Sequence, residues 1–215
     1  MNFNLVSITL DGNLKECLDL MKKNKIHRVI IEDTKSSTFT GFVTFEIIFD
    51  FFFNNFYSDM VNFNNEISSM NIISNKIITA KKSDTIYSCL VKFWTHKVSI
   101  LPIEDDMNDG DCDYFGYFFL KDIVYFFSNG DKFSFTDSIE KFIKDVYEDI
   151  EVERPYGKER IVITELEGTN LKTAMEMMTL SPERKIIFKN KNCDRPIGIL
   201  TLSDIFKIIN INECS

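Results

Sequence analysis

Cysteine and histidine are scarce in this chain of 215 residues. The five cysteines show no CxxC spacing and only two histidines are present, so a zinc cluster is not expected. An odd, scattered set of cysteines also fits reduced intracellular thiols better than a disulfide framework. The composition therefore predicts a protein without a metal site.

Long apolar runs and an excess of positive charge are also lacking. The most apolar run, residues 47–53, is interrupted by Asp50 and is far shorter than the ~20 residues that cross a bilayer. Residues 1–4 contain no basic region leading into an apolar one, so no signal peptide is predicted. The net charge of −8 argues against a general nucleic-acid binder. We therefore expect a cytoplasmic and/or nuclear protein that uses neither membrane nor nucleic acid.

Signatures of catalysis are missing as well. The sequence has no P-loop, no paired-carboxylate arrangement and no serine or cysteine set with a histidine. Its hydrophobic share of 44% and charged share of 27% are ordinary for a soluble globular protein. These features predict a globular protein that is not an enzyme and needs no catalytic cofactor.

The sequence contains one repeat that occurs three times. Each copy has an amphipathic helix with apolar residues at positions i, i+3, i+4 and i+7. The three stripes are Leu14, Cys17, Leu18 and Met21; Ile86, Cys89, Leu90 and Phe93; and Leu171, Ala174, Met175 and Met178. Ten residues after the second stripe position, the copies reach His27, Ser99 and Arg184, so all three keep the same register.

Apolar strands surround each of these helices. Strands are predicted before the helix at residues 5–9, 76–80 and 161–165, and after it at 29–31, 101–103 and 186–188. A polar turn then leads to Gly41, Gly116 or Gly198, which opens another strand and a second helix. The repeating unit is therefore strand, helix, strand, strand, helix.

Polar connectors at residues 54–75 and 128–158 separate the copies. The second connector predicts a helix within about 136–150, with Asp137 as its N-cap. Because one such unit cannot bury its sheet and helix faces alone, neighbouring units should pack together. We expect an unpaired first motif at 1–66 and a pair of motifs in 67–215, the second at about 72–130 and the third at about 158–212.

The last copy ends on a strand followed by a helix start. Thr201 can cap that helix, and Ser203 and Asp204 begin its apolar-periodic segment. Unpaired backbone N–H groups and the helix dipole favour an anion there, while the three polar side chains can bind hydroxyl groups. Taken alone, this pattern also fits an ordinary capped helix.

The ending Gly-hydrophobic-x-Thr/Ser-x-x-Asp resembles the CBS (cystathionine-β-synthase-type) motif, whose pairs bind adenine nucleotides. Residues 24–28, 95–102 and 202–205 look like parts of the second, third and fourth CBS motifs of the γ regulatory subunit of AMP-activated protein kinase. The first motif of that family has no counterpart here. The resemblance implies an α/β (α+β) fold of tandem CBS motifs, each a small sheet with two helices, the last two paired as a CBS (Bateman) module.

The resemblance also implies roles for individual residues in binding AMP, ADP or ATP. Asp204 and Asp122 match the aspartate that holds the ribose hydroxyls. The other matched residues are Thr201, Ser203 and Ser99 as hydroxyl donors, and His27, Arg28, Arg184, Lys185 and Arg154 at the phosphates. Adenine also needs an apolar slot, which Val98 and its strand neighbours can supply. A regulatory, energy-sensing subunit would bind its nucleotide without transforming it and would associate with the catalytic and scaffold subunits of a protein kinase.

Some positions depart from the family pattern. Ile47 stands where an aspartate is expected, and Glu46 would repel a phosphate. The unpaired first motif must be covered by a second copy, by another subunit or by a rearranged N-terminus, since its faces would otherwise be exposed. Two further hypotheses stay open: a CBS-fold scaffold that has lost nucleotide binding, and a free-standing CBS regulator of another enzyme or of a transporter.

Overall fold

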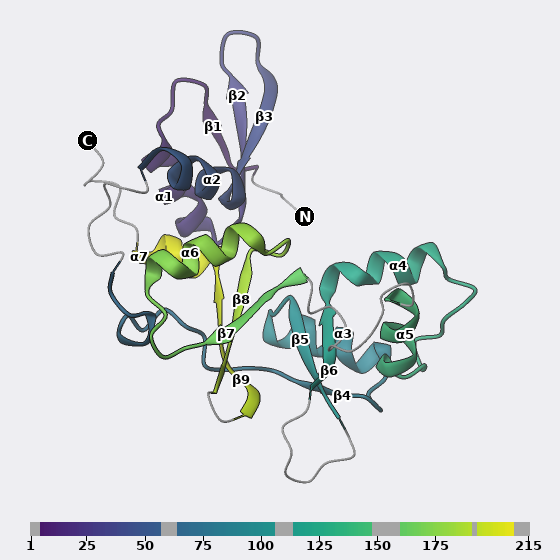
Figure 1. Ribbon diagram of the computed structural model, residues 1–215. Helices are drawn as coiled ribbons and strands as arrows, with labels where there is room; N and C mark the ends of the chain where they lie inside the picture. The colour runs from purple at the N-terminus through teal and green to yellow at the C-terminus, as the bar shows by residue number, and fades with distance from the viewer. Residues whose placement is uncertain (1–4, 57–63, 106–113, 148–159, 191–192, 209–215) are drawn as a thin grey trace. The chain divides into compact units, whose positions relative to one another are not determined.

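The computed structural model describes residues 5–56, 64–105, 114–147, 160–190 and 193–208 (Figure 1). It divides into two compact units. The first unit consists of Met1–Phe63 with Leu202–Ser215, and the second unit is Asn64–Thr201. The C-terminal helix therefore belongs to the same compact unit as the first repeat.

Each repeat forms one three-stranded sheet. The strands are β1 (Ser7–Thr9), β2 (Arg28–Asp33) and β3 (Thr38–Thr44); β4 (Ala80–Lys81), β5 (Ile100–Glu104) and β6 (Tyr114–Phe119); and β7 (Val162–Glu165), β8 (Lys185–Asn190) and β9 (Cys193–Thr201). In every sheet the first strand runs parallel to the second, and the third runs antiparallel to it. This confirms the predicted α/β fold class.

The helices lie where the apolar stripes predict them. They are α1 (Leu14–Asn24), α2 (Phe45–Phe56), α3 (Ile86–His96), α4 (Ile123–Ser128), α5 (Ile139–Val146), α6 (Leu171–Leu180) and α7 (Leu202–Ile208), with 3-10 turns η1 (Ile67–Ser69) and η2 (Leu120–Asp122). Asn13, Thr85 and Asn170 cap α1, α3 and α6 by accepting a backbone N–H with their side chains. The buried residues of these three helices all belong to the stripes.

The connector helix begins slightly later than the sequence suggested. Its N-cap is Ser138, whose hydroxyl accepts the Lys141 N–H at 3.3 Å. Asp137 is not the cap, because its carboxylate accepts the Ser134 N–H at 2.8 Å and so closes the preceding turn. The predicted N-cap was therefore wrong by one residue.

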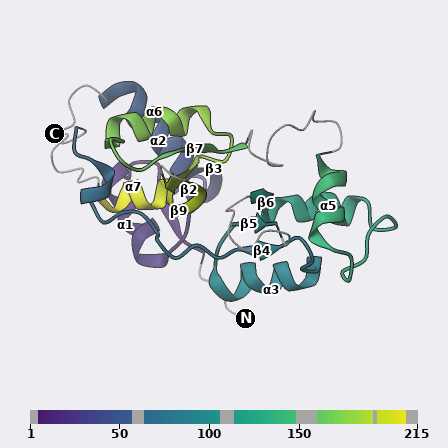
Figure 2. The same ribbon diagram turned by 60° about the horizontal axis from the view of Figure 1, so that its bottom comes forward.

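The second unit has two sheets packed face to face. Ile100, Tyr117 and Phe119 on β5 and β6 meet Ile161 and Ile187 beside and within the third sheet. The opposite face of the β4–β5–β6 sheet carries a larger core. There Leu101, Ile103 and Phe118 pack with apolar side chains from α3, α4 and α5. Helix α6 runs alongside β7 in both views (Figures 1 and 2), and it contacts β7 and β8.

In the first unit, the helices that follow β3 and β9 pack on each other. Phe45 at the start of α2 stacks on Phe206 of α7, with ring centroids 5.1 Å apart and planes 19° from parallel. Ile48, Phe49 and Ile205 nearby are also buried. Burial of each such side chain contributes roughly 1.5–3 kcal/mol relative to exposure. One face of α2, with Phe45, Phe49 and Phe52, therefore packs in a core, while Phe51 is exposed.

Gly198 is required by close packing. A Cβ atom at this position would lie 2.2 Å from Cγ2 of Ile73, in the segment whose Ser74 pairs with Ile199. We expect Gly198→Ala to lower the free energy of unfolding by about 1–3 kcal/mol because the added methyl overpacks this contact. The matched control is Gly41→Ala in the first repeat, where an added Cβ meets nothing within 4 Å. Urea denaturation measures both, and equal stabilities of the two variants would contradict the expectation.

Candidate functional site

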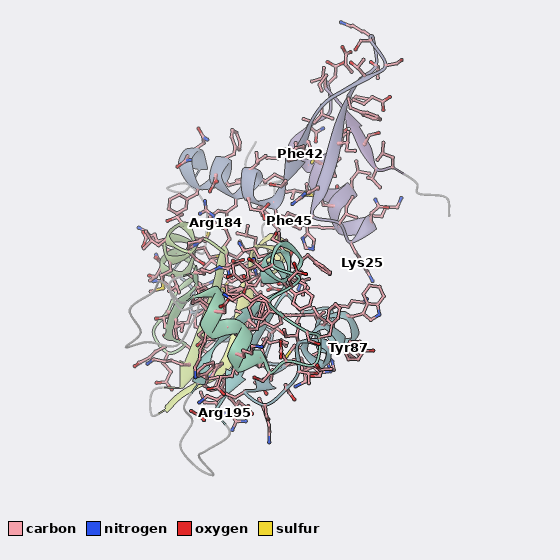
Figure 3. All side chains as sticks on the ribbon, turned by 90° about the vertical axis from the view of Figure 1, so that its right-hand side faces the viewer. Lys25, Phe42, Phe45, Tyr87, Arg184 and Arg195 are labelled. Carbon is pink, nitrogen blue, oxygen red and sulfur yellow. The ribbon has the colours of Figure 1, made fainter. Side chains whose placement is uncertain are left out.

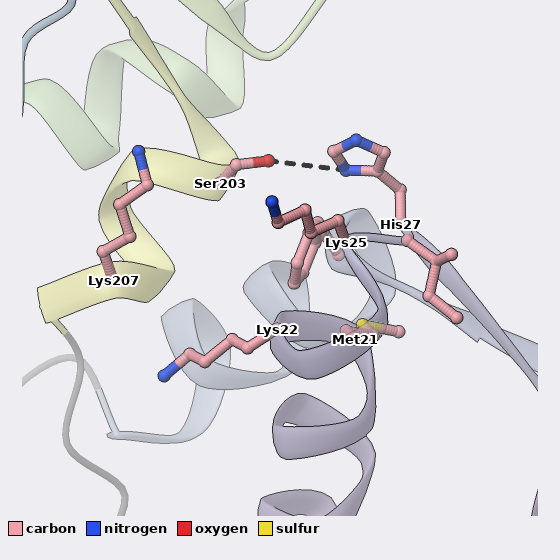
Figure 4. A pocket seen from close by; sticks show the side chains of 8 residues that line it. Met21, Lys22, Lys25, His27, Ser203 and Lys207 are labelled. Carbon is pink, nitrogen blue, oxygen red and sulfur yellow. Dashed lines mark hydrogen bonds between the residues drawn. The ribbon is translucent and has the colours of Figure 1, made fainter. Parts of the chain in front are cut away.

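A cavity of about 450 Å³ lies within the first unit (Figure 4). Its walls come from the end of α1, the turn into β2, the start of α2, and α7. The lining residues are Met21, Lys22, Lys25, Ile26, His27, Phe45, Ser203 and Lys207. The cavity thus joins two residues that the sequence singled out, His27 and Ser203, with side chains that it did not.

Cations and hydrogen-bonding groups surround the opening. Three lysines line the cavity, and Figure 4 shows Lys25 reaching toward the space between Ser203 and His27. The Ser203 hydroxyl hydrogen-bonds His27 Nδ1 at 3.4 Å. Lysine ammonium groups and imidazole or hydroxyl donors are the groups that bind phosphate oxygens. The polar side of this cavity is suited to an anion.

Apolar side chains also line the cavity. Met21 and Phe45 are buried in the core of the unit. The Phe45 ring is held between His27, edge-on at 5.3 Å, and Phe206, stacked at 5.1 Å. A flat apolar group in the cavity would therefore meet a fixed aromatic surface.

Local backbone geometry places the cationic residues at the mouth. Lys25 ends α1 in the left-handed conformation, with φ 54° and ψ 43°. Its N–H donates to the Lys22 carbonyl, and the Ile26 N–H donates to the Met21 carbonyl at 3.1 Å. This αL cap reverses the chain sharply, so that Lys25 and His27 follow the helix end directly.

Asp204 lies next to this cavity but not in its wall. Its carboxylate is largely buried and accepts a hydrogen bond from Lys207 Nζ at 2.6 Å. This ion pair orients Lys207, the one cavity lysine that lies on α7. An anion that reaches Lys207 therefore has to displace the Asp204 carboxylate or share the lysine with it.

The second predicted aspartate, Asp122, is engaged in a buried network of the second unit. Its carboxylate accepts hydrogen bonds from the Arg160 guanidinium, from the Phe119 N–H at 3.0 Å, and from the Tyr147 hydroxyl at 3.3 Å. The guanidinium also bonds to Glu183 and lies 4.0 Å from the centroid of the Phe119 ring. A ribose hydroxyl at Asp122 would have to displace one of these donors.

Burial and charge pairing act against each other on the ionisable groups of this network. Burial raises the pKa of Asp122, although the hydrogen bond and charge of Arg160 act in the opposite direction. Burial also acts to raise the pKa of Glu183, but Lys121, Arg160 and Lys185 outweigh it, so the pKa of Glu183 lies below its usual value. Burial lowers the pKa of Lys185 against the attraction of Glu183.

The remaining predicted residues within the described ranges lie outside the cavity wall. Val98 is half-buried against the larger core of the second unit, and the carbonyl of exposed Ser99 accepts the Leu120 N–H at 3.0 Å. Arg184 has φ 50° and donates to the Met178 carbonyl at 3.3 Å. Thr201 is half-buried at the end of β9, and Arg28 is exposed at the start of β2. Arg154 lies outside the described residues.

Sequence reasoning missed the lysines of the cavity and the central arginine of the network. Lys25 stands inside the segment 24–28 that carried the family resemblance, so its proximity to His27 was an available signal. Lys207 and Arg160 carried no such signal. Glu46, expected to repel a phosphate, is exposed and is not among the residues that line the cavity.

Within the described residues, no group of three or more histidine, cysteine, aspartate or glutamate side chains is arranged to hold a metal ion. Over the same part of the chain, every helix is too short or too polar to span a lipid bilayer.

Comparison with known proteins identifies the fold. The sequence profile of the CBS domain family matches residues 1–54. The structure is similar to a protein of Methanocaldococcus jannaschii described as a candidate archaeal homologue of γ-AMPK, with a TM-score of 0.68 and 14% identity over 95% of this chain and 66% of that one. It is also similar to an uncharacterized conserved protein from Pyrococcus horikoshii, with a TM-score of 0.61 and 16% identity over 94% and 78% of the two chains.

Among curated proteins, no sequence matches this chain. At the identities of the two structural neighbours, the likeness establishes the fold alone, and the chain spans 66% of the length of the M. jannaschii protein. The chain contains a CBS domain at residues 1–54, and its three sheets with their helices form a mixed α/β fold of tandem CBS motifs.

Proposed function

We propose that this protein is a non-catalytic regulatory subunit that binds an adenine nucleotide in the cavity of the first unit. One observation carries the proposal: three lysines, His27 and Ser203 line the same cavity as the apolar side chains of Met21, Ile26 and Phe45. A nucleotide combines an anionic phosphate with a flat, weakly polar base. The cavity volume of about 450 Å³ is within the range of small-molecule sites.

Individual roles follow from the positions of the side chains. Lys22, Lys25 and Lys207 bind the phosphates of AMP, ADP or ATP, with His27 and Ser203 as additional hydrogen-bonding partners. The base packs on the ring of Phe45. Asp204 follows Ser203 on α7 and accepts a hydrogen bond from Lys207. When the phosphates bind that lysine, the Asp204 carboxylate is left to accept a hydrogen bond from a ribose hydroxyl.

Regulation would arise from differential binding. A nucleotide shifts a partner between two states only by the difference in its affinity for those states. CBS domains are typically regulatory and ligand-binding, and the fold is shared with a candidate archaeal homologue of γ-AMPK. The proposed partners are therefore the catalytic and scaffold subunits of a protein kinase. Co-purification with a kinase subunit tests this part, and association with an unrelated enzyme or transporter would favour the free-standing regulator.

Calorimetric titration with AMP and with ATP tests the binding site. We expect Lys25→Met and Lys207→Met each to weaken binding about 10-fold to 100-fold, because each removes one charge-assisted hydrogen bond. The matched control is Lys23→Met, an exposed lysine in the same last turn of α1 that does not line the cavity. Absence of heat at millimolar nucleotide would exclude the sensing role. Equal affinities for all three variants would place the nucleotide elsewhere.

A second function is favoured by the network around Asp122. Arg160 and Tyr147 already donate hydrogen bonds to this carboxylate. The second unit therefore has protein side chains at the place where the resemblance implies a nucleotide. A CBS-fold scaffold that binds other subunits without any nucleotide would have this property. A chain that assembles with its partner and shows no nucleotide-dependent melting shift would establish the scaffold.

A further inference from the structure

The side chains that line the cavity of the first unit are of two chemical kinds. Lysine, histidine and serine supply positive charge and hydrogen bonds, while methionine, isoleucine and phenylalanine supply apolar surface. None of the lining side chains carries an amide or a carboxylate. Adenine is distinguished from the other bases by paired hydrogen bonds, for which the asparagine or glutamine amide has the matching geometry. The lining therefore holds no side chain of the kind that singles out adenine.

The backbone of the turn between α1 and β2 is used within the fold. The N–H groups of Lys25 and Ile26 both donate to carbonyls of the last turn of α1, at 3.3 and 3.1 Å. The Phe45 N–H donates to the His27 carbonyl at 3.4 Å. The helix cap and the start of α2 thus use peptide groups that could otherwise pair with the edge of a base.

The aromatic surface in the cavity holds a base by stacking. Phe45 is 7% exposed, and its ring is fixed between His27 and Phe206. Figure 3 shows Phe45 and Lys25 on the first unit, where both line the cavity. Every nucleobase has a π-face, so stacking on an aromatic ring tolerates any of them. Phe45 can therefore bind a base without recognising which base it is.

The positive charge of the cavity is directed at phosphates. Among the residues that the structure describes, the ammonium groups of Lys22 and Lys25 form no ion pair, whereas Lys207 is paired with Asp204. Charge-assisted hydrogen bonds are roughly twice as strong as those between neutral groups. Each further phosphate on a ligand can add such a bond, and a change of base adds none.

We propose that this site selects its ligand by the phosphate groups and not by the base, so that it accepts nucleoside polyphosphates as a class. The inference rests on the proposed function, because it concerns the same cavity. It differs from the resemblance, which implies adenine nucleotides alone. ATP and GTP are then equivalent ligands.

Calorimetric titration of the full chain with ATP, GTP, AMP and inorganic triphosphate tests the proposal. We expect ATP and GTP to bind with dissociation constants within about 3-fold of each other, since stacking does not discriminate between them. AMP should bind at least about 10-fold more weakly, because it lacks the phosphates that reach further lysines. Inorganic triphosphate should compete with both triphosphates.

Lys22→Met locates the selection in this cavity. It should weaken the binding of ATP and of GTP by the same factor, about 10-fold to 100-fold, because one charge-assisted hydrogen bond is lost from each complex. Lys23→Met, in the same turn of α1 but outside the cavity lining, should change neither affinity. Both lysines are exposed, and circular dichroism checks that the variants keep the fold.

The outcomes separate this inference from the proposed function. ATP binding more than about 30-fold tighter than GTP would overturn the inference and leave the proposed function standing. Inorganic triphosphate that binds through Lys22, with no heat from ATP or GTP, would uphold selection by phosphate and remove the proposed function. Equal binding of ATP and GTP that Lys22→Met leaves unchanged would overturn the inference, since the shared site would lie elsewhere. No heat from any of the four ligands would overturn both.

Discussion

Replacing Arg160 by methionine is expected to lower the free energy of unfolding by about 3–5 kcal/mol. The guanidinium is the common partner of Asp122 and Glu183, whose side chains are only 6% and 7% exposed. Methionine retains much of the apolar contact that the arginine stem makes, but it removes the guanidinium that pairs with Asp122 and leaves Glu183 with Lys121 and Lys185 only. The cost therefore comes from uncompensated burial of charge, and chemical denaturation of the full chain measures it.

The exposed Arg195 on β9 provides the control, because it carries the same charge outside the buried network. Arg195→Met should change stability by less than about 0.5 kcal/mol, as surface substitutions usually do. If both variants lose the same stability, net charge and not the network would be the cause. A fully stable Arg160→Met would show that Tyr147 and the Phe119 N–H suffice to compensate Asp122.

The loss caused by Arg160→Met should shrink as the pH falls. Burial raises the pKa of Asp122 and Arg160 lowers it, so removal of the guanidinium raises this pKa further. A carboxyl with a raised folded pKa favours the folded state below its unfolded pKa, and this advantage is lost as the pH rises through the folded pKa. The difference between wild type and variant is therefore largest at neutral pH. A difference that stays constant into the acid range would argue against a charged Asp122.

The second large effect is expected from Phe142→Ala in the connector helix. Phe142 is fully buried, and its ring lies 5.6 Å from Phe118 and 5.2 Å from Phe133, measured between centroids. Removal of a buried phenylalanine ring costs about 3–5 kcal/mol, because the lost burial adds to the cavity that is left behind. A thermal melt followed by circular dichroism measures the change.

Phe127→Ala on α4 is the matched control, since Phe127 is 68% exposed. It should leave the melting temperature nearly unchanged. A small effect of Phe142→Ala would mean that α5 is only loosely attached to the second unit. The connector between the second and third repeats would then not be part of the core.

The repeat itself could be predicted from the sequence because it rests on local patterns. The stripe Cys17, Leu18 and Met21 recurs in three copies, and in each copy these positions face a core. Gly198 was predicted to begin a strand, but β9 begins at Cys193 and Gly198 lies inside it. Its contact with Ile73 was not foreseen, because that contact joins segments more than one hundred residues apart.

The candidate site was predicted only in part, for the same reason. His27 and Ser203 were identified and do meet, but the lysines that make the cavity cationic come from the end of α1 and from α7. Asp122 was identified as a ligand-binding residue, and its partner Arg160 was not, because 38 positions separate the two in the chain. No local periodicity records which side chains of distant segments will meet.

The sequence by itself determined the repeat of this protein: strand, helix, strand, strand, helix, occurring three times. These features depend on interactions between residues a few positions apart, which a sequence displays directly. Only the tertiary structure decided which copies of equivalent faces are buried, as with Tyr117, and which are exposed, as with Phe42. It also decided that the Asp122 carboxylate is buried and paired with Arg160, since burial and charge pairing depend on how distant segments pack.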